Sequence, residues 1–190
     1  MGAAAVLKIS VEEYLAADRV AEIPSEYYDG EVFTISAVSW HHGVIAGNTG
    51  HGFAGRLACG PCRLAMRVRV RVTKAHFVFP DLVIVCGKPA LTDEAADTIT
   101  NPKVIVEVMS PPTSDYDHGA KFALYRRVPS LEDYVLIAQD QPNVEVFHKT
   151  PEGGWLLNTY EGLEAVAAIA SLEIALPLAE LYAGIEFATP

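Results

Sequence analysis

Cysteine, basic residues and long apolar runs are all scarce in this sequence of 190 residues. Its three cysteines are an odd, low number, which disfavours a disulfide scaffold and favours a reducing compartment. No apolar run approaches the roughly 18 residues of a membrane span. The first residues also lack the basic start and apolar stretch of a secretion signal. We therefore expect a cytoplasmic protein with no membrane partner.

Acidic residues outnumber basic ones by 24 to 14, which gives a formal net charge of −10. Such a charge disfavours indiscriminate binding to nucleic acid, which normally needs a basic surface, but it leaves room for a local basic groove. Apolar residues make up 51% of the chain and charged residues 20%, as is usual for globular proteins. The length predicts one domain, residues 1–190, with a substantial core.

The cysteines raise two alternative functions. Residues 59–62, CGPC, have the spacing of the thioredoxin redox motif, but in that fold a Trp precedes the motif and a helix follows it. Here Ala58 precedes it, a helix-like stretch leads into it and a strand follows, so Gly60 and Pro61 are better explained as a helix end and a turn. Zinc binding by the cysteines and a histidine is less favoured, because no second ligand pair has suitable spacing.

The pattern of apolar residues and turn signals predicts both helices and strands. Ser10 and Glu13 form a capping box that begins a helix, and Asp29-Gly30 turns a hairpin over residues 25–36. Further helices are expected over 40–58, within 110–130 and in the tail, 170–187, where a short helix has a proline at its start. Strands are expected over 62–73, 81–86, 103–109, 132–138, 143–149 and 155–162. This order predicts an α/β (α+β) fold with one mixed central β-sheet flanked by helices.

Three charged residues stand where apolar residues would pack better. Asp81 begins an inner strand, Glu107 interrupts an otherwise apolar strand, and Lys121 lies on the helix that follows. Burial of a carboxylate is costly unless it is paired or binds a metal. Two carboxylates on adjacent strands suit Mg²⁺, and a nearby lysine would orient a water molecule and offset charge in the transition state. The predicted chemistry is hydrolysis of a phosphodiester.

These residues belong to a longer pattern. FPDLVIV, followed by VIVEVMSPPTSDYDHGAKFALY, resembles the signature of PD-(D/E)xK nucleases, and the sequence is most similar to the Uma-type restriction endonucleases. That branch shares a helix like SVEEYLA, a hairpin like SEYYDGE, a Pro-Asp strand and the motif EVxSPST…D…K…Y. The last motif is matched here by Glu107, Ser110, Asp117, Lys121 and Tyr125. The resemblance covers roughly residues 8–185.

The resemblance implies a restriction endonuclease-like core and an endonuclease that acts on DNA, with duplex DNA as the expected partner. It also implies Mg²⁺ as the cofactor, for which Mn²⁺ can substitute, with Asp81 and Glu107 as metal ligands and Glu31 as an additional acidic member of the site. The chain departs from the parent signature at Met109, where the catalytic lysine would stand. Lys121 would replace that lysine from the helix. By analogy with other enzymes that cut both strands, a homodimer is also expected.

Simpler interpretations stay open at this point. Glu107 and Lys121 could form a purely structural salt bridge in a non-catalytic protein that keeps the nuclease fold for binding or as a scaffold. Arg67, Arg69 and Arg71 alternate along one strand face and could contact phosphates, although a solvated sheet face is slightly favoured. The histidines at 41 and 42 are assigned no catalytic role.

Overall fold

A six-stranded mixed sheet forms the centre of the protein. The computed structural model describes residues 8–92, 95, 97–111 and 113–187. The strand order is β11 (Trp155–Glu161), β10 (Asn143–Lys149), β9 (Asp133–Ala138), β8 (Val104–Met109), β6 (Leu82–Cys86) and β3 (Cys62–Met66). Strands β8 and β9 are parallel, and the other neighbours are antiparallel. The predicted mixed sheet flanked by helices is confirmed.

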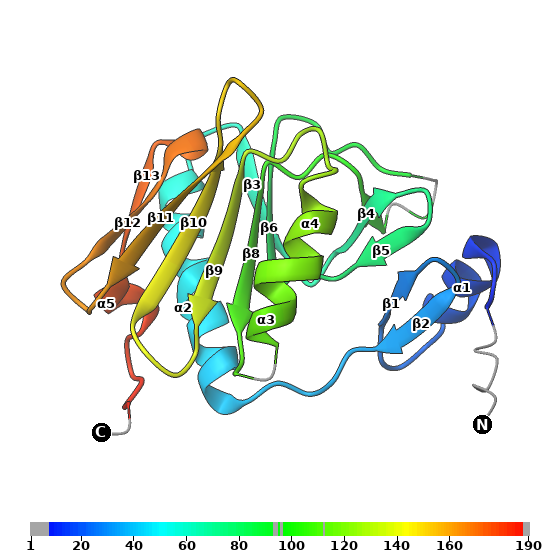
Figure 1. Ribbon diagram of the computed structural model, residues 1–190, viewed down its shortest axis with the longest axis horizontal. Coiled ribbons are helices and arrows are strands. Elements are labelled where there is room, and N and C mark those ends of the chain that lie inside the picture. Colours follow the sequence, from blue (N-terminus) through cyan, green and yellow to red (C-terminus); the bar gives the residue numbers. More distant parts are fainter. Residues whose placement is uncertain (1–7, 93–94, 96, 112, 188–190) are drawn as a thin grey trace.

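A smaller sheet lies beside the central one. Its strands are β2 (Glu31–Thr34), β1 (Ser25–Tyr28), β5 (His76–Val78), β4 (Arg69–Thr73) and β7 (Thr98–Ile99). Helix α1 (Val11–Asp18) packs on it through an aromatic cluster of Tyr14, Tyr27 and Phe77, and its predicted capping box is present. The hairpin of β1 and β2 is also as predicted, and in Figure 1 it lies apart from the large sheet, joined to α2 by an extended segment.

Helices cover both faces of the large sheet. The long α2 (Trp40–Leu57) lies on one face with α5 (Leu178–Leu181), and the segment of α3 (Ser114–Tyr116), the π-helical turn η1 (Asp117–Lys121) and α4 (Phe122–Tyr125) lies on the other (Figure 1). Alternate residues of β8 divide between the two cores. Val106 and Val108 belong to the core under α2, whereas Ile105 and Met109 belong to the core under α4. Glu107 therefore points towards the α3–α4 segment.

The predicted single strand over residues 62–73 is wrong. The chain breaks at Arg67, which adopts a left-handed φ of 51°, and β3 and β4 then join different sheets. Arg69 is buried, and its Nη2 lies 2.6 Å from Oδ2 of Asp18, so it holds α1 against β4. The arginines consequently do not form one exposed row along a strand, because Arg69 is buried in an ion pair with Asp18.

The tail contains the predicted short helix after its proline, and the residues before the proline form other structure. Its first half forms the 3₁₀ turn η2 (Ala170–Leu172) and strand β13 (Ile174–Pro177), which pairs with β12 (Val166–Ile169). Helix α5 begins only after Pro177, which cannot donate a helical backbone hydrogen bond and therefore suits a helix start. Pairing with β12 thus makes residues 174–177 a strand, and the short helix follows the proline as predicted.

The cysteines do not support a redox pair within CGPC. Cys62 on β3 stands opposite Cys86 on β6, and the two sulfurs form a disulfide, while Cys59 is exposed and free. The odd, low number of cysteines did not predict this bond. The redox alternative, which needed Cys59 and Cys62 as partners, is wrong because Cys62 is bonded to Cys86. Among the described helices, none is both long and apolar enough to cross a membrane.

Candidate active site

Asp81 and Glu107 lie side by side on neighbouring strands. Asp81 directly precedes β6, which pairs with β8 so that Leu82 stands opposite Val106. The Oδ2 atom of Asp81 accepts a 2.8 Å hydrogen bond from the backbone N–H of Val108, the residue after Glu107. Both acidic residues line a cavity of about 470 Å³ that lies between the large sheet, the start of α2 and the β1–β2 hairpin.

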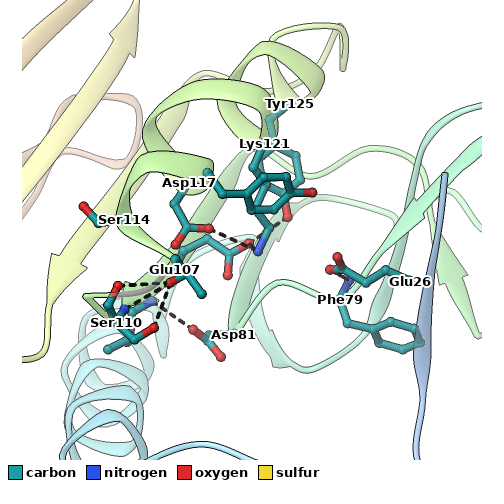
Figure 2. A network of polar contacts seen from close by, with 12 residues as sticks. Glu26, Phe79, Asp81, Glu107, Ser110, Ser114, Asp117, Lys121 and Tyr125 are labelled. Carbon is teal, nitrogen blue, oxygen red and sulfur yellow. Dashed lines mark hydrogen bonds and ion pairs between the residues drawn. The ribbon is translucent and has the colours of Figure 1, made fainter. Parts of the chain in front are cut away.

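Lys121 reaches the same place from the helix above. Its Nζ lies 2.8 Å from Oε1 of Glu107 and 3.6 Å from Oδ1 of Asp117, and Figure 2 shows the amine between the two carboxylates. The hydroxyl of Tyr125 donates a 2.7 Å hydrogen bond to the same Oε1 of Glu107. The π-helical turn that carries Asp117 and Lys121 is a feature often found at functional sites. The predicted convergence of Asp81, Glu107 and Lys121 is therefore present.

The motif residues between β8 and the helix fix this geometry. Ser110 and Thr113 are joined through their hydroxyls at 3.0 Å, and the carbonyl of Ser110 accepts from the backbone N–H of Ser114. Both Ser110 and Thr113 line the cavity. This turn starts the helix directly after β8, so Asp117 and Lys121 come to lie above Glu107.

For both Glu107 and Lys121, burial and the charge of the ion-pair partner shift the pKa in opposite directions. Glu107 is only 4% exposed, and burial raises its pKa to about 8, although the charge of Lys121 opposes the rise. For Lys121, burial would lower the pKa, but the carboxylates of Glu107, Glu26 and Asp117 outweigh it and raise the pKa above its usual value. The lysine therefore keeps its proton and acts as a positive charge and hydrogen-bond donor, not as a base.

The raised pKa of Glu107 predicts a pH-dependent stability. Between the usual value of 4.5 and about 8, the folded protein holds a proton that the unfolded chain has lost. In metal-free buffer, this contribution is complete below pH 4.5 and is lost as the pH rises through about 8. Glu107→Gln should flatten the fall in the free energy of unfolding, measured by urea denaturation at several pH values. Glu180→Gln, at an exposed position of α5, should keep the wild-type slope. If Glu107→Gln also keeps the wild-type slope, burial of Glu107 does not cause the pH dependence.

His42 belongs to the site, although it was assigned no catalytic role from the sequence. Its Nε2 lies 3.0 Å from Oδ1 of Asp81, and it also lines the cavity. Ser39 caps α2 by accepting from the backbone N–H of His42, which places the histidine in the first turn of the helix. The available signal was the helix start at Ser39, but only the tertiary fold brings that turn to Asp81.

Glu26 is a further cavity residue that was not predicted from the sequence. Glu31, which was predicted, does not line the cavity. Glu26 lines the cavity with Asp81; its Oε1 accepts from the N–H of Phe79, and its Oε2 accepts from the hydroxyl of Tyr28. Glu31 lines a neighbouring hollow instead. The alternation along SEYYDGE could have indicated Glu26, because it shares a strand face with Tyr28. An assisting role for Glu31 stays a prediction.

The donor atoms of the site suit a hard divalent cation. No group of three or more His, Cys, Asp or Glu side chains within the described part of the chain is arranged to hold a metal ion. The candidate ligands are the two carboxylates of Asp81 and Glu107, and Mg²⁺ commonly uses one or two carboxylates together with retained waters. Lys121 and Tyr125 both bond to Oε1 of Glu107. The cavity supplies the space that the waters require.

Comparison with known proteins places this site in a family. A family model described as "Putative restriction endonuclease" matches residues 11–179, a range that includes Asp81, Glu107 and Lys121. The chain belongs to the Uma2 family. The resemblance inferred from the sequence motifs is thereby confirmed at the level of the family.

Relatives of this Uma2 chain match along most of its length. Two Synechocystis proteins, "Uncharacterized protein slr1290" and "Uncharacterized protein sll1609", are 29% and 28% identical to it over 183 and 169 residues. These matches cover 95% and 87% of this chain and 94% and 95% of the relatives. A crystal structure from Anabaena variabilis, titled as "a putative nuclease belonging to DUF820", superposes with a TM-score of 0.75 at 16% identity, covering 92% of this chain and 97% of that one. That likeness supports the restriction endonuclease-like fold.

Proposed function

We propose that this Uma2-family chain is an Mg²⁺-dependent endonuclease that hydrolyses phosphodiester bonds in DNA. Asp81 and Glu107 hold the metal, and Lys121 orients the attacking water. The observation that supports this most strongly is the approach of the Lys121 amine to within 2.8 Å of Glu107, in the cavity that Asp81 also lines. The helix thus supplies the amine that the strand lacks at Met109.

Each residue then has a distinct task. Lys121 has three N–H donors, and its amine lies 2.8 Å from Glu107 and 3.6 Å from Asp117. A further donor can then contact the attacking water or a phosphoryl oxygen. The positive charge of Lys121 offsets the negative charge that develops on the phosphoryl oxygens. His42 and the N–H of Val108 fix the orientation of the Asp81 carboxylate. Bound Mg²⁺ would polarise the phosphoryl group and lower the pKa of a bound water.

Nicking of supercoiled plasmid by the full chain tests this function. We expect relaxed and linear products when Mg²⁺ or Mn²⁺ is present. We expect no products in EDTA, or in a buffer in which Ca²⁺ is the only divalent cation. Cys59→Ser should nick as the wild type does, because Cys59 is exposed and outside the cavity. Absence of nicking with either metal would favour the alternative, a non-catalytic nuclease fold used for binding or as a scaffold. A homodimer stays a prediction.

His42 should support metal binding through Asp81. Loss of a group that orients a metal ligand typically weakens metal affinity or activity by about 10–100-fold. His42→Ala should therefore raise the Kd for Mn²⁺, measured by isothermal titration calorimetry, by about that factor, while excess metal restores part of the nicking. His41→Ala is the matched control on the same helix. If both variants bind Mn²⁺ as the wild type does, His42 has no role in positioning Asp81.

A further inference from the structure

The β1–β2 hairpin presents a second set of side chains next to the catalytic cavity. In its register, Glu26 stands opposite Phe33 and Tyr28 stands opposite Glu31. Directly opposed residues of antiparallel strands share a face, so these four side chains lie on one side of the hairpin. The other side carries Tyr27, which packs in the cluster under α1. The hairpin therefore packs against α1 through one face, and its other face is directed towards the cavity.

The aromatic residues on this face are held in fixed positions. The ring of Phe33 packs edge-on against Tyr28, with ring centroids 5.6 Å apart. The hydroxyl of Tyr116, from α3, donates a 2.7 Å hydrogen bond to the hydroxyl of Tyr28, which in turn donates to Glu26. Phe33 and Tyr116 nevertheless stay 50% and 40% exposed. They form a pre-positioned aromatic surface that is partly open to a ligand.

This aromatic surface lies between two neighbouring hollows that share lining residues. Glu26, Phe33 and Tyr116 line the catalytic cavity, and the same three residues line a neighbouring hollow of about 520 Å³. The remaining residues that line the second hollow are Lys8, Tyr28, Asp29 and Glu31. A chain-like ligand can therefore extend from the catalytic carboxylates over Phe33 and Tyr116 into the second hollow.

The charges around the cavity favour contacts with bases over contacts with phosphates. Four carboxylates line it, from Glu26, Asp81, Glu107 and Asp117, against the single amine of Lys121. With a formal net charge of −10, the protein is poorly suited to hold a duplex by neutralising many phosphates. Stacking of bases on aromatic side chains needs no such charge, and it contributes about 1–3 kcal/mol per base.

We propose that the second hollow holds an unpaired nucleobase of the DNA strand that is cut. The base stacks on Phe33 and Tyr116, and the carboxylate of Glu31 accepts a hydrogen bond from an amino group on the base edge. A base inside an intact duplex cannot enter, because it is paired and stacked. The proposal rests on the proposed function and narrows its substrate to DNA with unpaired nucleotides, whether in a free single strand or flipped out of a duplex.

Three DNA substrates of one sequence test the proposal: a single strand, a perfect duplex and a duplex with a central mismatch. With Mg²⁺, we expect kcat/KM for the single strand to exceed that for the perfect duplex by about tenfold or more. Cleavage at the mismatch would identify a flipped base as the ligand, and cleavage of the single strand alone would identify a free strand. Phe33→Leu, which keeps an apolar side chain but removes the aromatic ring, should lower kcat/KM for the preferred substrate about tenfold.

Leu156→Ala is the matched control, because Leu156 is exposed on the edge strand β11, outside both hollows. Binding of a fluorescent single strand without metal, measured by anisotropy, gives a second readout that does not depend on catalysis. Equal cleavage of all three substrates, unchanged in Phe33→Leu, would overturn the base-binding proposal and leave the nuclease intact. If the wild type cuts no substrate, the proposed function fails, and the anisotropy of wild type against Phe33→Leu still decides whether the hollow binds bases.

Discussion

Glu107→Gln and Asp81→Asn are each expected to abolish Mg²⁺-dependent nicking of plasmid DNA. The amides keep the shape of the side chains but remove the negative charges that would hold the cation. A metal ion contributes several kcal/mol of charge stabilisation in the transition state. Its loss corresponds to a decrease of about 10³-fold or more in rate, at about 1.4 kcal/mol per factor of ten. The measurement is the initial rate of nicking at saturating wild-type Mg²⁺ concentration.

The control for this experiment is Glu180→Gln, which removes a carboxylate that is exposed and paired with Arg56, away from the cavity. It should nick as the wild type does. Thermal denaturation should show that Glu107→Gln and Asp81→Asn are folded, so that lost activity reflects the site. Nicking at the wild-type rate in both amide variants would mean that the cleaving activity lies elsewhere or comes from a contaminant.

Lys121→Met is expected to lower the nicking rate by about 10²–10³-fold, the usual cost of removing one donor that stabilises transition-state charge. Mn²⁺ affinity should be retained or increased, because the ammonium that competes with the cation at Oε1 of Glu107 is gone. Lys121→Met thus separates catalysis from metal binding, whereas Asp81→Asn should lose both. Calorimetric titration with Mn²⁺ and single-turnover nicking, run on the same preparations, measure the two effects.

A structural salt bridge predicts a different result for Lys121→Met. Removal of one partner from a buried ion pair commonly costs about 3–5 kcal/mol of stability. If the pair is only structural, urea denaturation should show this loss while the folded fraction keeps its full nicking rate. That outcome would contradict the assigned role of Lys121. Reduced activity in the folded fraction, with Lys121→Arg partly restoring it, supports that role.

Charged residues at positions where apolar residues would pack better were predictable from the sequence. Glu107 lies in a strand whose neighbours are apolar on both faces, and its burial demands a partner. The position of Asp81 beside Glu107 follows from the strand order. The position of Lys121 follows from the short turn after β8, which folds the helix back over the strand. The capping box of α1 and the Asp-Gly hairpin were equally local signals, and the structure has both.

What could not be predicted depends on contacts between distant segments. His42 and Glu26 enter the cavity only because α2 and the β1–β2 hairpin dock beside β6. Arg69 is buried because Asp18, far away in the sequence, supplies its counter-charge. The bond between Cys62 and Cys86 depends on the register of β3 against β6. The alternation along SEYYDGE indicates only the strand face on which Glu26 lies, and no local pattern indicates which distant segment each of these residues contacts.

The most direct test of the metal site is a crystal structure of the full chain soaked with Mn²⁺, with anomalous scattering used to locate the ion. We expect an anomalous peak next to carboxylate oxygens of both Asp81 and Glu107, with the Lys121 amine close enough to contact a water on the ion. No peak at these carboxylates under saturating Mn²⁺, or a peak only at other residues, would contradict it.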